Sequence, residues 1–227
     1  MRAFFTLVLT TRMALLACGC EDIVPADDTG NPRLPSSLPA LEALPLLSIA
    51  AGARHAVVLT CHGTAYAWGV NETGCCGREY PLSISVPVPM QVPIGKNQIP
   101  NGPSPFLSWA LWDGPAEPVC LSDDVAMVHA ACGNGHTVLV TRSGRLLVCG
   151  QNSQHQLGLI STANIAHAEL VVQPETGIQF TSAEAGDFHT VLLDNEGSVW
   201  QMGNGSLLER VLHGKRILAI AAGGQQS

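Results

Sequence analysis

The chain of 227 residues is 46% hydrophobic and 13% charged, a composition that excludes intrinsic disorder and can build a substantial core. Its net charge of −7, with 11 Lys and Arg residues, argues against a nucleic-acid binder, which needs a basic face to neutralise phosphate. The 23 glycines and 15 prolines favour short strands and turns over long helices. The composition therefore predicts a globular all-β protein whose partner surface is basic rather than acidic.

Residues 1–20 combine features of an export leader with one feature that opposes it. Arg2 and the apolar body resemble a secretory signal, and the segment before Cys18 loosely resembles a bacterial lipoprotein cleavage site with Cys18 lipidated. Arg12 interrupts the apolar body, where a positive charge is costly. No run reaches the roughly 20 apolar residues of a transmembrane helix. We expect a cytoplasmic protein, with an exported or lipid-anchored one as the alternative.

Residues 21–45 are dominated by proline, serine and aspartate, which predicts a linker. We therefore expect an irregular N-terminal segment, followed by one domain over residues 46–227.

Three copies of one motif organise that domain, near residues 50–77, 130–158 and 184–203. In each copy a first glycine comes three residues before a histidine. A second glycine comes eight residues after that histidine, and a third comes six residues after the second. The positions are Gly52, His55, Gly63 and Gly69, then Gly133, His136, Gly144 and Gly150, then Gly186, His189, Gly197 and Gly203.

The segments between these positions are apolar and rich in β-branched residues. Each copy holds two such runs joined by a polar turn, CHG, RSG or NEG, which predicts a β-hairpin. A small antiparallel sheet cannot bury both of its faces alone, so the copies must pack against one another.

At these residues the chain resembles the regulator of chromosome condensation repeat, a blade of a seven-bladed β-propeller. The first copy also matches the family pattern at Trp68 and Asn71, and the second at Asn152. A fourth copy begins within residues 219–227 and carries Gln226 at the histidine position. The resemblance implies an all-β partial propeller of about three blades plus a terminal strand.

The outer strand of each blade is less regular in sequence. Ser83–Val92 is the candidate in the first blade, where proline restricts it to an edge. The run HAELVVQP is the candidate in the second blade, and the LLERVL run of the third could form a strand or a helical turn.

A long interruption follows the first copy and contains three aromatic residues. Long loops on a rigid scaffold often carry binding residues, so Phe106, Trp109 and Trp112 form a candidate interaction loop. The alternative is that the two tryptophans cover an open blade face.

The sequence offers little catalytic chemistry. The motif histidines occupy equivalent positions on separate blades, which favours a structural, hydrogen-bonded role. His129, Cys132 and His136 have a spacing compatible with zinc, but no second pair of ligands follows, so we expect no metal and no other cofactor. Eight cysteines could form disulfides or remain buried thiols, and we favour thiols.

Three functions are compatible with this pattern. The first is a non-catalytic protein-interaction module, part of a larger propeller. The second, implied by the resemblance because the founding member acts on a nuclear GTPase, is guanine-nucleotide exchange on a small GTPase. The third is an exported propeller that binds an extracellular protein. An arc of three blades also predicts self-association to complete a ring.

Overall fold

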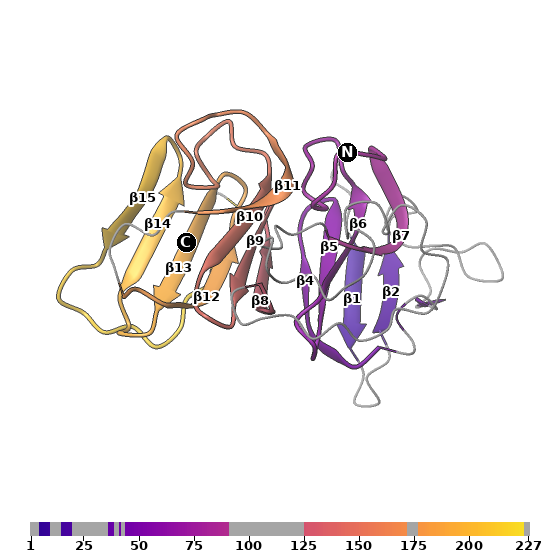
Figure 1. The fold of residues 1–227 in the computed structure, drawn as a ribbon, viewed down its shortest axis with the longest axis horizontal. Coiled ribbons are helices and arrows are strands. Elements are labelled where there is room, and N and C mark those ends of the chain that lie inside the picture. The colour runs from indigo at the N-terminus through magenta and orange to yellow at the C-terminus, as the bar shows by residue number, and fades with distance from the viewer. Residues whose placement is uncertain are drawn as a thin grey trace, which may run out of the picture.

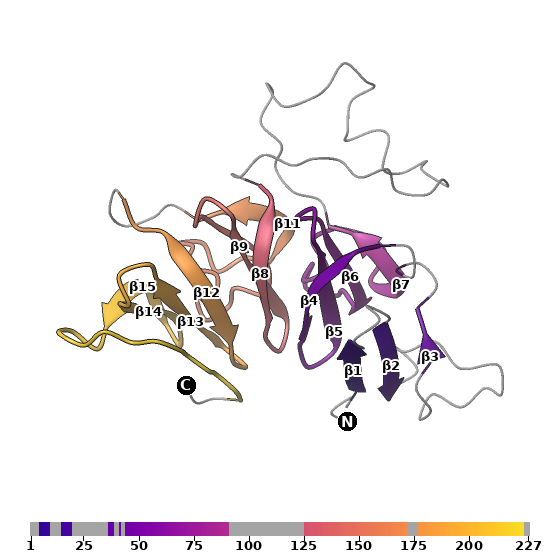
Figure 2. The ribbon, with the colours of Figure 1, turned by 90° about the horizontal axis from the view of Figure 1, so that it is seen from below.

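The computed structural model describes residues 5–9, 15–19, 36–38, 41, 44–90, 125–171 and 177–224. This part of the chain contains fifteen strands in four antiparallel sheets. Three of the sheets are four-stranded blades that stand side by side in an open arc (Figures 1 and 2). No helix in the described residues is long and apolar enough to cross a membrane.

Each blade runs from an inner to an outer strand in chain order. The first blade consists of β4 (Leu46–Ala51), β5 (His55–Thr60), β6 (Ala65–Val70) and β7 (Ser83–Pro89). The second consists of β8 (Met127–Cys132), β9 (His136–Thr141), β10 (Leu146–Gly150) and β11 (Ile165–Leu170). The third consists of β12 (Phe180–Ala185), β13 (His189–Asp194), β14 (Val199–Gly203) and β15 (Ser206–Val211).

The predicted hairpins form the middle of every blade. The motif histidine that begins the second strand is paired with the third motif glycine, as His55 is with Gly69. The second motif glycine closes each tight turn with a positive φ, 85° at Gly63 and 78° at Gly144, which side chains disfavour. Both ends of the hairpin are therefore set by glycines of the repeat.

The third blade ends in a different connection. β14 passes directly to β15 through Asn204 and Gly205, whose φ angles of 52° and 89° are those of a two-residue type I′ turn. The LLERVL run, which the sequence left undecided, is thus an outer strand. The two edge-strand candidates of the other blades correspond to β7 and β11.

A small sheet precedes the first blade, in place of the irregular segment that we expected. β1 (Phe5–Leu9), β2 (Leu15–Gly19) and β3 (Ser36–Ser37) are paired in that order, and β1 lies against β4. The expectation failed because two apolar runs that are too short for a signal core have the right length for a hairpin. Leu38 and Leu41 are buried in the core of the first blade.

Two main cores fill the spaces between the blades, and a smaller one lies beyond the third. The start of the fourth copy, residues 217–224, runs along this third blade. Ile217 N donates to Gly197 O at 2.8 Å, as Phe180 N does to Gly144 O at 2.9 Å one interface earlier. These residues therefore occupy the place of a further inner strand.

Candidate interaction surface

The first motif histidine links the first blade to the second. His55 Nε2 lies 2.8 Å from Thr137 Oγ1, the residue that follows the motif histidine of the next blade. The Thr137 hydroxyl donates a 2.7 Å hydrogen bond to Cys75 O in the loop after β6. A chain of imidazole, hydroxyl and carbonyl therefore ties a strand of each blade to a loop.

The second interface repeats this chain and shows which tautomer it requires. The Thr190 hydroxyl donates to Gln156 O at 2.9 Å, so His136 Nε2, 3.1 Å from the hydroxyl oxygen, must be the donor to it. Burial, with smaller effects from His55 and His189, lowers the pKa of His136 from 6.5 to about 3. At neutral pH this ring is an uncharged internal donor, which is a structural role.

The remaining residues considered for zinc have other surroundings. His129 Nδ1 accepts a long, 3.4 Å hydrogen bond from Ala183 N across the interface between the second and third blades. Within the described residues, no cluster of three or more His, Cys, Asp or Glu side chains could hold a metal ion.

Four buried cysteines lie between the first two blades, and all are free thiols. Cys149 Sγ donates to Cys75 O at 3.4 Å, and burial raises the pKa of the Cys149 thiol well above its usual value. Cys149 thus fills space as a small apolar side chain, whereas a hydrogen bond from Cys76 lowers the pKa of the Cys75 thiol well below its usual value.

The first motif glycine is required because there is no room for a side chain at this position, not because its φ angle is positive. A Cβ on Gly133 would lie 2.5 Å from Gly186 O and would overlap the ring of His136. A Cβ on Gly52 would likewise overlap Gly133 O and approach the ring of His55. The inner strands therefore approach one another main chain to main chain at these positions.

The loop between β6 and β7 is braced by one buried asparagine. Asn71 Nδ2 donates to Arg78 O at 2.8 Å and to Pro81 O at 3.0 Å, while Asn71 Oδ1 accepts from Cys76 N at 2.9 Å. Asn71 itself is 1% exposed. One side chain thus satisfies three main-chain groups and fixes the path of the loop.

Asn152 repeats this brace between β10 and β11. Its Nδ2 donates to Leu159 O and Ser161 O, and its Oδ1 accepts from Leu157 N at 2.9 Å. The third blade has no such loop, because Asn204 and Gly205 connect its last two strands directly.

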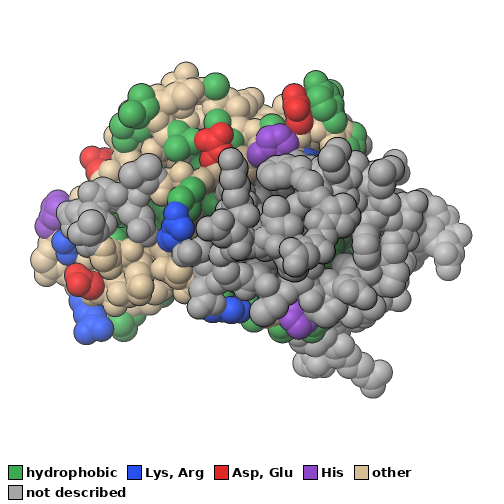
Figure 3. Space-filling model, in the orientation of Figure 1, with side chains coloured by type: hydrophobic (Ala, Val, Ile, Leu, Met, Phe, Trp, Pro, Cys, Tyr) green, Lys and Arg blue, Asp and Glu red, His purple; other side chains and the backbone are tan. Residues whose placement is uncertain are grey.

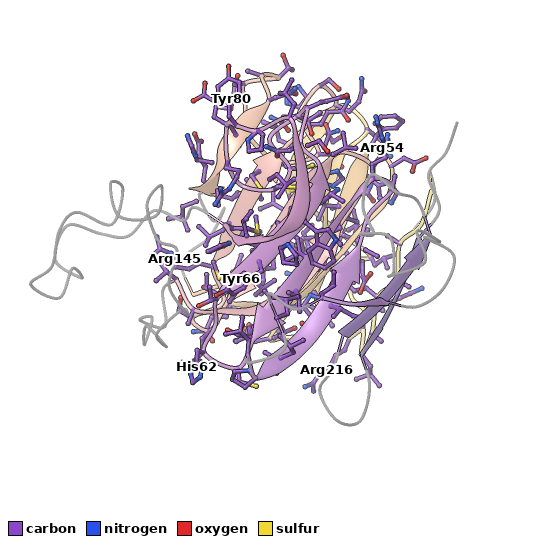
Figure 4. All side chains as sticks on the ribbon, turned by 90° about the vertical axis from the view of Figure 1, so that its right-hand side faces the viewer. Arg54, His62, Tyr66, Tyr80, Arg145 and Arg216 are labelled. Carbon is purple, nitrogen blue, oxygen red and sulfur yellow. The ribbon has the colours of Figure 1, made fainter. Side chains whose placement is uncertain are left out.

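We define the rim as the two braced loops, residues 71–82 and 151–164. The rim exposes three large apolar side chains: Tyr80 (69%), Leu82 (56%) and Ile160 (85%). Figure 3 shows hydrophobic side chains along the upper edge of the molecule, where these loops lie. In Figure 4, Tyr80 lies at one end of the blades, and His62, Arg145 and Arg216 lie toward the other.

The loops also reach across to the neighbouring blade. Thr73 Oγ1 donates to Gly135 O at 2.7 Å, and Gly205 N of the third blade donates to Gln154 O at 3.0 Å. The rim is therefore held in place by both its own blade and the next one.

The predicted interaction residues Phe106, Trp109 and Trp112 lie outside the described residues. Met90 and Val125 flank the intervening segment, and the neighbouring main chain is bonded at the turn end of the blades: Met90 N donates to Ala65 O, and Met127 N to Gly63 O. Sequence reasoning missed the rim residues, although a large apolar residue soon after each GCCG or QLG segment was the available signal.

Comparison with known proteins supports the repeat assignment. Two family models, both described as Regulator of chromosome condensation (RCC1) repeat, match residues 47–77, 127–156 and 143–193. The probable E3 ubiquitin-protein ligase HERC6 of Homo sapiens is 26% identical over 175 residues, which cover 75% of this chain and 14% of that protein. The human regulator of chromosome condensation is 26% identical over 206 residues, 73% of this chain and 49% of that protein.

Solved structures agree on the fold. Human WBSCR16 superposes with a TM-score of 0.71 at 15% identity, covering 97% of this chain and 54% of that one. Yeast RCC1 (Prp20), solved bound to Kap60, superposes with a TM-score of 0.70 at 16% identity, covering 97% and 50%. The chain spans about half the length of these structures. The segments that match the regulator of chromosome condensation repeat are built as neighbouring blades, so the chain carries repeats of this kind and has a β-propeller fold.

Proposed function

We propose that this chain is a non-catalytic protein-interaction module that binds a partner protein through its rim, as part of a larger propeller. The observation that carries the proposal is the exposure of Tyr80, Leu82 and Ile160 on loops that are otherwise internally hydrogen-bonded. Exposed apolar side chains that gather on one edge mark binding surfaces more often than scattered ones do.

The braces explain why such a surface can bind tightly. Ordering a loop on binding costs conformational entropy, and a loop that is already ordered avoids much of that cost. Asn71 and Asn152 hold both loops before any partner arrives. Tyr80 offers the large, rigid, amphipathic side chain that is common at the centre of protein interfaces.

A paired substitution tests this proposal. The variant Leu82→Ser with Ile160→Ser should lose most of the proteins that co-purify with the wild-type chain, as quantified by mass spectrometry. Leu212→Ser is the matched control, because Leu212 is 54% exposed but lies beyond β15, away from the rim. Equal recovery of partners by the rim variant and the control, with unchanged thermal unfolding in both, would contradict the proposal.

A second candidate is nucleotide exchange on a small GTPase. It is supported by the likeness to a Caenorhabditis elegans protein named X-linked retinitis pigmentosa GTPase regulator homolog, 29% identical over 135 residues and 49% of this chain. If the chain is an exchange factor, it will accelerate release of a fluorescent guanine nucleotide from a small GTPase. A rim that only binds the GTPase will leave that rate unchanged.

A further inference from the structure

The interface between the first two blades contains four thiols at positions that hold no thiol in the next interface. Cys75 and Cys76 lie in the loop after β6, Cys132 ends β8, and Cys149 lies near the end of β10. Cys132 is 8% exposed, and the other three are 2% exposed or less. The equivalent residues one interface later are Gln156, Leu157, Ala185 and Met202. The repeat is thus built at these positions without sulfur, so the fold itself does not require the thiols.

The strand register places two of the thiols on one face of the second blade. Thr137 of β9 is paired with Cys132 of β8 on one side and with Cys149 of β10 on the other. Residues directly opposite each other in an antiparallel sheet point to the same face. The Thr137 hydroxyl donates to Cys75 O at 2.7 Å, so this face is turned toward the first blade. Cys132 and Cys149 therefore face the loop that carries Cys75.

Cys149 makes a direct contact with Cys75, although the two residues are 74 positions apart. Cys149 Sγ lies 3.4 Å from Cys75 O. A Cβ placed on Gly150 would lie 3.1 Å from Cys75 Cα, so the end of β10 packs against the main chain of Cys75. A disulfide requires main chains that approach closely, with Cα atoms roughly 4.4 to 6.8 Å apart. Cys149 is therefore the partner that the packing assigns to Cys75.

Cys75 is the thiol of this group that ionises most readily. In its neutral form it donates from Sγ to Val70 O at 3.2 Å. A hydrogen bond from Cys76 and the charge of His55 favour the thiolate more than burial opposes it, and they lower the pKa of Cys75 well below its usual value. The thiolate, not the thiol, attacks an oxidant. Cys75 is thus the member of the group that is most ready to react.

His55 holds the proton that balances this thiolate. Burial alone would lower the pKa of His55, but the charges of Cys75 and Cys132 beside the ring raise it well above its usual value. His136 occupies the same repeat position beside Gln156 instead of Cys75, and burial lowers its pKa to about 3. The thiols therefore turn a structural histidine into an internal proton source.

We propose that Cys75 and Cys149 are a redox-sensitive pair that hydrogen peroxide converts into a disulfide joining the first blade to the second. The Cys75 sulfur attacks one peroxide oxygen, the O–O bond breaks, and the departing hydroxide takes the proton of His55 to form water, leaving Cys75 as a sulfenic acid. The Cys149 sulfur then attacks the Cys75 sulfur, the S–O bond breaks, and the hydroxide leaves as water with the proton of the Cys149 thiol. The protein loses two electrons and two protons, and one peroxide becomes two waters.

The burial of the pair restricts the oxidant to a small molecule, and hydrogen peroxide meets this condition. Cys75 belongs to the first rim loop but lies on its buried side. The oxidation needs no partner protein, so its test does not depend on whether the rim binds one. A disulfide would tie this rim loop covalently to the second blade.

The test maps the disulfides of the full chain after treatment with hydrogen peroxide. The protein is alkylated, digested with trypsin without reduction, and examined by mass spectrometry. Trypsin cuts after Arg54, Arg78, Arg145 and Arg210, so Cys75 and Cys149 fall on different peptides, 55–78 and 146–210. We expect these two peptides to be linked in a single chain after treatment and to separate on reduction.

Three variants identify the cysteine of the first peptide that forms the link. Cys75→Ser should lose it. Cys61→Ser and Cys76→Ser are the matched controls, because their thiols lie on the same peptide, and both should keep the link. Cys76→Ser should form it more slowly, since the Cys76 hydrogen bond that favours the Cys75 thiolate is then weaker.

Three results would overturn the proposal. The first is the absence of the linked peptides from the treated wild type while the exposed Cys61 is oxidised, a result that needs no variant. The second is a link that persists in Cys75→Ser or disappears in Cys61→Ser. The third is a link that joins two chains, seen as a dimer on a non-reducing gel, because the disulfide would then not lie between blades of one molecule.

Discussion

The first two blades and the third are built from the same motif but differ at two places. In the first two, a long loop braced by Asn71 or Asn152 follows the third strand, and the motif histidine is hydrogen-bonded to the next blade. In the third, a two-residue turn replaces the loop, and His189 has no partner among the described residues. The hairpin is thus the constant part of the repeat. The loop and the hydrogen bond of the motif histidine to the next blade depend on what lies next to the blade.

The largest difference in stability between equivalent substitutions should appear at the first motif glycine. Gly133→Ala would place a methyl group against Gly186 O and the His136 ring, so we expect a loss of about 4 kcal/mol in the free energy of unfolding. Gly223→Ala, in the segment that runs along the third blade, has no atom within 4 Å of the new Cβ and should change the free energy of unfolding by less than about 0.5 kcal/mol. Urea unfolding measures both, and equal losses would break the comparison.

The second-largest loss of stability is expected when an asparagine that braces a rim loop is replaced. Asn152→Ala removes three hydrogen bonds to the main chain, including the one that satisfies the buried Leu157 N, so we expect a loss of about 3 kcal/mol in the free energy of unfolding. Asn204→Ala in the third blade only forces alanine to a φ of 52°, for which about 1 kcal/mol is expected. Faster hydrogen exchange over residues 151–164 should accompany the first substitution and not the second.

The hydrogen bonds that join the second blade to the third through Thr190 can be removed without replacing a histidine. Thr190→Val removes the acceptor of His136 Nε2 and the donor to Gln156 O, and should cost about 2 kcal/mol. Thr190→Ser keeps the hydroxyl and should cost less than half as much. If serine and valine destabilise the protein equally, packing rather than the hydrogen bond holds this interface.

Lowering the pH should gradually reduce the free energy of unfolding, because His136 is buried and uncharged between the second and third blades. The unfolded chain binds a proton at His136 below pH 6.5, whereas the folded chain does so only near pH 3. Stability is therefore lost as pH falls from 6.5 toward 3, by about 1.4 kcal/mol per pH unit from this residue. Unfolding between pH 6.5 and 5 should show a loss of about 2 kcal/mol that is absent in His136→Gln.

The sequence was sufficient for the repeated parts of the fold. Glycine and histidine spacing predicted the central hairpins, and proline placed β7 at an edge. The sequence did not predict β1 and β2, because two short apolar runs near the N-terminus fit an interrupted signal core as well as they fit a pair of strands.

The candidate surface was harder to foresee than the fold. Asn71 and Asn152 were recognised as repeat positions, but their role depends on main-chain groups up to ten residues away, which spacing does not reveal. Each motif histidine is hydrogen-bonded to a threonine of the next blade that is 82 positions away for His55 and 54 for His136. Such distant pairs cannot be identified from local sequence spacing.

The close approach of Gly52, Gly133, Gly186 and Gly224 has a consequence for how such chains diverge. Successive blades meet at these glycines through main-chain atoms, which are the same whatever side chains fill the cores. Core residues are therefore free to change together, provided that volume is kept. The curvature of the arc can then persist when few residues are shared, as it does between this chain and WBSCR16 at 15% identity.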